Sequence, residues 1–149
     1  MTEILISIQP KWCEKIMNLS KRWEMRKTRP KEPGPYMVYI YQTEGGGVIG
    51  TFVCDSFFPV TPDDFNKAIL NDCQLTMKEA LEYAAGKMVY LWRIRSLVEY
   101  REPRPLSDFK LERPPQSWCY VNTMWEKVDG AHLENGEIVI EPKGEDANV

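Results

Sequence analysis

Alternation of apolar and polar positions predicts strands along much of the chain. The run from Glu3 to Ile8 predicts a first strand, and the largely apolar run Tyr36–Tyr41 predicts a central strand buried on both faces. Val48–Phe58 predicts its return strand, because the three glycines at 45–47 are typical of a hairpin turn. The same pattern predicts further strands at 88–100, 118–121 and 136–141.

Short helices are predicted between these strands. Pro10 suits the first turn of a helix, and the apolar spacing after it predicts a helix as far as Leu19. Thr61 and Thr76 are each followed three residues later by an acid, so each predicts the N-cap of a further helix. Gly86 suits the left-handed position that ends the last of these helices.

The order of these elements predicts an α+β fold. We expect a small, mostly antiparallel β-barrel with inserted and flanking helices. The proline-rich stretch 102–116 is expected to be ordered coil with one short helix after Ser107. A chain of 149 residues fits one domain, which we place at 1–125, followed by an acidic and partly flexible C-terminal extension at 126–149.

The distribution of charge is uneven. The segment from Lys21 to Lys31 holds six Lys or Arg residues and one acid, which gives +6 − 1 = +5, whereas the whole chain carries −3. An acidic protein is repelled by duplex DNA, so we expect a small, local contact with an anionic partner. The alternative is an edge strand whose charges only keep it solvated.

Cysteine and histidine usage limits the chemistry. The four cysteines form no CxxC pair, and His132 is the only histidine, so we expect neither a zinc site nor histidine-based catalysis. No cofactor is implied, and the thiols are expected to be core residues. The start of the chain has no signal-like pattern and no apolar run reaches membrane-spanning length, so a cytoplasmic protein without a membrane partner is the simplest assignment.

Lys21, Glu24 and Arg26 form the candidate site. On a strand, Glu24 and Arg26 point the same way, about 7 Å apart, and such a pair can read a nucleobase. Lys21 has the opposite parity and joins them only if a turn at 18–20 precedes the strand. The other interpretations are a surface salt bridge and a lysine–carboxylate pair that transfers protons.

Further residues are candidates for the same site. The binding residues expected beside the first three are Arg22, Lys27 and Arg29. The rings expected to stack on a base are Trp23, Tyr39 and Tyr41. Arg93 and Arg95 share one parity and are expected to face the same cleft as Arg26.

These residues resemble the signature of the ASCH domain superfamily, Gly-x-Lys-x-x-Glu-x-Arg. Lys21, Glu24 and Arg26 match its charged positions, and Leu19 stands at the glycine position. The stretches around the motif that resemble phage and bacterial members are Leu5–Pro10, Glu14–Ile16, Arg104–Leu106 and Arg113–Trp118. The resemblance therefore extends from about Glu3 to Val121.

The resemblance implies a PUA-like fold, a cleft lined by the motif residues and a role linked to RNA. Some small ASCH proteins are amidohydrolases that act on acetylated cytidine, and nuclease activity is reported for others. The amidohydrolases use the motif lysine with a threonine. Lys21 matches that lysine, but Glu24 stands at the threonine position and cannot replace its hydroxyl as a nucleophile.

Three hypotheses for function follow. The first is a binding module that holds single-stranded RNA or a nucleotide in a cationic cleft. The second is a small hydrolase acting on a modified nucleoside or on RNA, with Lys21 as general base or electrostatic stabiliser and Glu24 as proton shuttle. The third is an adaptor that grips an acidic protein partner. Whether the chain is an enzyme stays open, as does its oligomeric state.

Overall fold

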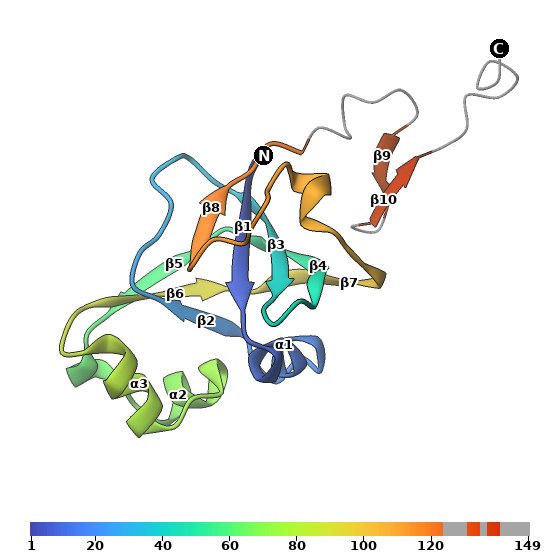
Figure 1. Cartoon of the computed structure of the whole chain (residues 1–149). Coiled ribbons are helices and arrows are strands. Elements are labelled where there is room, and N and C mark those ends of the chain that lie inside the picture. Colours follow the sequence, from blue (N-terminus) through green and yellow to red (C-terminus); the bar gives the residue numbers. More distant parts are fainter. Residues whose placement is uncertain (124–130, 135–136, 141–149) are drawn as a thin grey trace, which may run out of the picture.

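Two sheets contain most strands of the computed structural model, which describes residues 1–123, 131–134 and 137–140 (Figure 1). The larger sheet has the order β7-β4-β3-β1-β8, and the smaller has the order β2-β6-β5. The strands of the two sheets are β1 Thr2–Ile8, β2 Trp23–Arg26, β3 Tyr36–Gln42, β4 Gly47–Cys54, β5 Phe57–Val60, β6 Val89–Arg93, β7 Arg95–Arg104 and β8 Trp118–Tyr120.

The predicted central strand is confirmed. β3 lies between β1 and β4, parallel to the first and antiparallel to the second. Val38, Tyr39 and Ile40 are completely buried, because neighbouring strands and packed side chains cover both faces of β3. Parallel pairing of β1 with β3 requires a crossover, and residues 9–35 supply it. The candidate site lies on this crossover.

The predicted barrel does not form among the described residues, whose strands pair into open sheets, although six of the seven strand pairings are antiparallel as expected. Two predicted long strands are each divided. The return strand breaks at Asp55 and Ser56, and the strand at 88–100 breaks at Ile94. At each break the chain passes from one sheet to the other: from β4 to β5 at the first and from β6 to β7 at the second. The two sheets are therefore connected along the chain but do not close into a barrel.

Aromatic rings fill the space between the two sheets. The ring centroid of Trp92 on β6 lies 5.2 Å from that of Phe57 on β5 and 5.8 Å from that of Trp118 on β8. Phe57 also contacts Tyr36 on β3, with 5.4 Å between ring centroids. These edge-to-face contacts fix the smaller sheet, which carries β2, against the larger one.

Three α-helices lie near β2 and the end of β1 (Figure 1). Their bounds are α1 Pro10–Met17, α2 Lys67–Cys73 and α3 Met77–Ala84. Thr76 caps α3 with Glu79 as predicted, and Gly86 follows with φ +77°. The prediction at Thr61 is only partly right: its capping box starts a 3-10 turn at Pro62–Asp64, and Asn66 caps α2 instead.

The C-terminal part is described at a few residues only. β9 (Ala131–Glu134) and β10 (Glu137–Ile140) form an antiparallel hairpin. The rest of the predicted extension at 126–149 lies outside the described residues, so its boundary and flexibility stay predictions. No helix among the described residues is both long and apolar enough to cross a membrane.

Candidate functional site

A tight turn after α1 brings Lys21 to the candidate site. The N–H of Ser20 donates to the carbonyl of Lys15 (3.1 Å), and the N–H of Leu19 donates to that of Ile16 (3.0 Å), which is a Schellman motif. Leu19 has φ +70°, the left-handed conformation that favours glycine. This turn at 18–20, which the sequence analysis required, directs the side chain of Lys21 to the same side as those of Glu24 and Arg26. Leucine adopts the left-handed conformation at the position where the ASCH signature has glycine.

The side chains of Lys21, Glu24 and Arg26 converge as predicted. Lys21 Nζ lies 3.3 Å from Glu24 Oε1, and Arg26 Nη2 lies 2.7 Å from Glu24 Oε2. All three residues are buried, with exposed fractions of 3%, 5% and 9%. The interpretation as a solvated surface salt bridge is therefore wrong for these three residues.

All three nitrogens of the Arg26 guanidinium donate hydrogen bonds to protein oxygens. Its Nε and Nη2 both donate to Glu24, Nη2 also donates to the backbone oxygen of Ser7 (2.7 Å), and Nη1 donates to Ser117 Oγ (3.1 Å). These contacts join β2 to β1 and to the segment before β8. Because its donors are committed to protein oxygens, the guanidinium positions Glu24 and closes one wall of the site.

Glu24 stays ionised despite its burial. Burial acts to raise its pKa, but the charges of Lys21 and Arg26 outweigh that effect and hold the pKa of the carboxyl below its usual value. Lys21 also donates to the carbonyl of Cys73 at the end of α2. Two of its three N–H groups thus have acceptors among the described residues.

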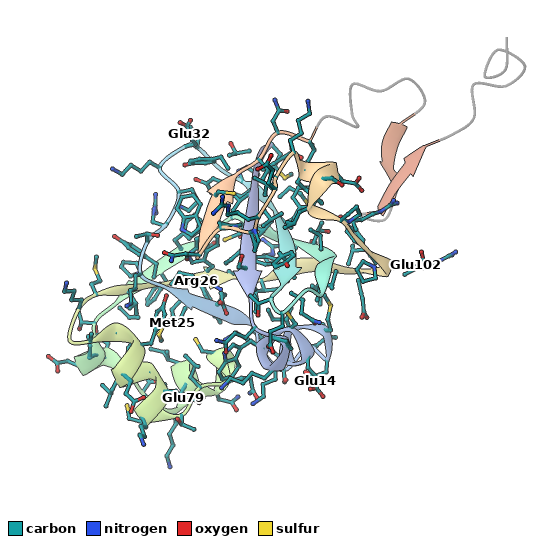
Figure 2. All side chains as sticks on the ribbon, viewed as in Figure 1. Glu14, Met25, Arg26, Glu32, Glu79 and Glu102 are labelled. Carbon is teal, nitrogen blue, oxygen red and sulfur yellow. The ribbon has the colours of Figure 1, made fainter. Side chains whose placement is uncertain are left out.

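A cavity of about 570 Å³, here called the Lys21 cavity, opens above these side chains. Figure 2 labels Arg26 and Met25 on β2 and Glu79 on α3, two elements that face each other across it. The residues that line it are Ser7, Gln9, Trp12, Lys21, Glu24, Met25, Arg26, Thr43, Leu75, Glu79, Glu82, Tyr83 and Gln116. A volume of this size suits a small molecule.

The lining is not cationic, contrary to the prediction. Its two cations, Lys21 and Arg26, face the three carboxylates of Glu24, Glu79 and Glu82, which gives +2 − 3 = −1. The prediction overlooked α3, because helix 77–84 is remote from the basic segment in sequence. Trp12 and Tyr83 supply the aromatic surface, and Lys21 Nζ lies 5.1 Å from the Trp12 ring centroid.

The other predicted binding residues lie outside the cavity. Arg22 is exposed on a different hollow, which also contains Arg93 and Arg95. The expectation that Arg93 and Arg95 face the same cleft as Arg26 is therefore wrong. The reason is the register of β2 and β6, which pairs Arg93 with Trp23, so that its side chain lies on the opposite face of the sheet from Arg26. The N–H of Ile94 donates to the carbonyl of Arg22, and Arg95 lies beyond the start of β2.

Lys27 and Arg29 take different positions again. Lys27 Nζ lies 5.0 Å from the ring centroid of Tyr83, which lines the Lys21 cavity, so Lys27 stands at its rim. Arg29 packs its guanidinium 4.9 Å from the ring centroid of Phe57, away from the cavity. Of the rings expected to stack on a base, Tyr39 and Tyr41 are buried in the core, and only Trp23 is half-buried.

Three of the four thiols are buried core groups, as predicted, and the fourth, Cys119, is half-buried. Cys13, Cys54 and Cys73 are buried, and burial raises the pKa of Cys13 and of Cys73 to about 12 and that of Cys54 to about 11. Thiols with such values are protonated at neutral pH and are poor nucleophiles. Within the described residues, no group of three or more His, Cys, Asp or Glu side chains is arranged to hold a metal ion.

Several lining residues were not among the candidate site residues predicted from the sequence. Gln9, Thr43 and Gln116 come from three different loops, and only the fold brings their polar side chains to one cavity. Trp12 belongs to the apolar spacing that predicts α1, and a half-buried indole fits this helical period as well as a fully buried one does.

Comparison with known proteins gives the fold independently. No protein-family model and no curated protein matches the sequence. The crystal structure of the ASCH protein from Zymomonas mobilis matches with a TM-score of 0.71 at 19% identity, over 80% of this chain and 87% of that one. A mutant of the same protein matches with a TM-score of 0.71 at 20% identity, over 82% and 91% of the two chains. The chain therefore has the fold of an ASCH domain.

Proposed function

We propose that the Lys21 cavity binds one nucleoside unit, either free as a nucleoside or nucleotide or as part of a single-stranded RNA. The observation that carries the proposal is the buried Lys21–Glu24–Arg26 cluster at the floor of a cavity of about 570 Å³. Maintaining ionised groups in the interior is expensive in free energy, so proteins retain them where they have a use. The likeness to an ASCH protein agrees with a PUA-like RNA-binding module.

The lining offers the contacts that a base and its sugar require. Trp12 and Tyr83 present rings, and a base stacks on such rings with about 1–3 kcal/mol per base. Gln9, Thr43 and Gln116 carry neutral donors and acceptors that suit the polar edge of a base. In this proposal the remaining N–H of Lys21 donates to a carbonyl oxygen of the base, and Lys27, whose Nζ lies 5.0 Å from the Tyr83 ring centroid, contacts a phosphate.

A substitution of Lys21 tests this proposal. Lys21→Met keeps the length and apolar stem of the side chain but removes its charged donor. We expect affinity for nucleosides and nucleoside monophosphates, measured by calorimetry, to fall at least about tenfold, because a hydrogen bond from a charged donor contributes about 1.5–3 kcal/mol. The exposed Lys87→Met is the matched control and should bind as the unaltered protein does. Equal affinity in both variants would refute the proposal.

Hydrolysis of the bound nucleoside or RNA is the second candidate. The observation that favours it is the 3.3 Å contact between Lys21 Nζ and Glu24 Oε1 within the cavity, since such a pair can pass a proton to or from a bound water. Arg26 takes no part in this chemistry except to orient the carboxylate. Incubation with N-acylated cytidines and short RNAs, followed by chromatography, decides the matter: products that vanish in Lys21→Met support hydrolysis, and intact substrates remove it.

A further inference from the structure

A second hollow, here called the arginine groove, carries the opposite charge to the Lys21 cavity. It consists of two depressions that share Arg95 and Ser96. The five cations of its lining are Lys21, Arg22, Arg29, Arg93 and Arg95, and its two acids are Asp55 and Asp72, so the lining carries +5 − 2 = +3. The cavity lining carries −1. The basic segment predicted from sequence thus divides between two surfaces, and its accessible arginines lie in the groove.

The arginines of the groove retain donors for a ligand. Arg22 and Arg93 are exposed, and neither forms an ion pair with any residue that the structure describes. Arg95 pairs with Asp55 through one nitrogen, which leaves other N–H groups of the guanidinium available. Arg29 Cζ lies 4.9 Å from the Phe57 ring centroid, and Arg29 forms no ion pair with the residues that the structure describes.

The groove is formed by backbone that is held in place. The N–H of Ile94 donates to the carbonyl of Arg22 (2.9 Å), and the N–H of Arg93 donates to that of Ser56 (3.1 Å). Ser96, the second residue of β7, takes a left-handed conformation with φ +50°, which turns the chain within the groove. The arginines therefore project from fixed positions, so a bound anion does not have to order a loop.

We propose that the arginine groove binds the phosphodiester backbone of single-stranded RNA. Guanidinium groups bind phosphate through paired hydrogen bonds, and four of them line the two depressions of the groove. Trp23 lines the groove and contacts Phe58, a ring that is 55% exposed, with 6.5 Å between ring centroids. Exposed aromatic surface beside arginines suits unpaired bases, and an acidic peptide has no equivalent need for it.

The proposal goes beyond the function proposed for the Lys21 cavity and does not depend on it. The two surfaces meet at Lys21, which lines both. A protein could bind nucleosides in the cavity without using the groove, or RNA in the groove without using the cavity. Each outcome can therefore be measured separately.

The test measures binding of a fluorescent twelve-nucleotide oligouridylate by anisotropy at several salt concentrations. The double variant Arg22→Ala plus Arg93→Ala should bind at least about tenfold more weakly. Its slope of log affinity against log salt should be shallower by about 1.4, because each lost phosphate contact removes about 0.7 for single strands. The control, Lys67→Ala plus Lys87→Ala, removes two exposed cations elsewhere and should leave both values unchanged.

Two further arms make the result decisive. Arg22→Lys plus Arg93→Lys keeps both charges and should restore most of the salt slope. Equal affinity for the oligonucleotide in the alanine and control variants would overturn the proposal, as would tight binding of polyglutamate by a protein that fails to bind RNA. Nucleoside binding in the cavity should be the same in the groove variants as in the unaltered protein. If the unaltered protein binds no nucleoside, the proposal for the cavity fails and the proposal for the groove is unaffected.

Discussion

At the scale of single residues, the candidate site depends on compensation of buried charge. Among the residues that the structure describes, Glu24 is the only acid that contacts both Lys21 and Arg26, and each of its oxygens contacts one of them. Glu24→Gln would leave two buried cations without their counter-charge. We expect it to lower the free energy of unfolding by about 3–5 kcal/mol, measured by urea denaturation at neutral pH. Glu82→Gln, which changes an exposed acid at the rim, should cost far less.

The same residue predicts a dependence on pH. The pKa of Glu24 in the folded protein lies below its ordinary value of 4.5, so ionised Glu24 stabilises the fold above that pH, and the stabilisation is lost as pH falls through the folded-state pKa. The difference in unfolding free energy between the unaltered protein and Glu24→Gln should therefore be constant near neutral pH and shrink below pH 4.5. A difference that does not vary down to about pH 3 would contradict this assignment.

At the scale of elements, the sequence predicts the strands and caps that depend on local patterns. It does not predict the points where the chain passes from one sheet to the other. β1, α1, β3 and the cap of α3 follow from periodicity and capping residues within each segment. The break at Ile94 falls within the alternation of Arg93, Ile94 and Arg95, and the polar pair Asp55–Ser56 is too short to indicate a change of sheet. Both breaks arise from packing of the two sheets around Trp92 and Phe57, which no local pattern encodes.

The candidate site, too, could be predicted from the sequence only in part. Lys21, Glu24 and Arg26 were predictable because one strand and one turn bring them together. The acidic side of the cavity was not, since Glu79 and Glu82 reach it only through the tertiary position of α3. Arg22 and Arg29 belong to the same basic segment, yet strand parity and the loop after β2 direct them to another surface.

The turn that ends α1 gives a prediction at this scale. Leu19 is 68% exposed and holds a left-handed conformation, which is unfavourable for a residue with a Cβ atom. Leu19→Gly should raise the free energy of unfolding by about 0.5–1 kcal/mol, because glycine adopts this conformation without the steric penalty. Leu19→Ala retains the penalty and serves as the control. Thermal and urea unfolding should rank glycine above both alanine and leucine, and a destabilising glycine would contradict the Schellman geometry.

At the scale of the whole molecule, the fold separates two kinds of surface that the sequence places in one segment. One side of β2 faces the Lys21 cavity, whose floor holds buried and compensated charges and whose lining includes two aromatic rings. The start of β2 and the loop after it border an open groove that carries accessible arginines. This division suits a protein that holds one nucleoside unit in a pocket and contacts phosphates elsewhere.

The most direct test of the central claim uses the tryptophan indoles as reporters. Trp12 lines the Lys21 cavity and Trp23 lines the arginine groove, so their indole N–H signals in a nitrogen-15 spectrum distinguish the two surfaces. The five tryptophan signals can be assigned by single Trp→Phe variants. Titration with uridine, cytidine, adenosine and guanosine should shift the Trp12 signal with at least one of them, saturably, and leave Trp23 unmoved. No movement of Trp12 with any nucleoside at millimolar concentration, or movement of Trp23 alone, would contradict the claim that the cavity is a nucleoside site.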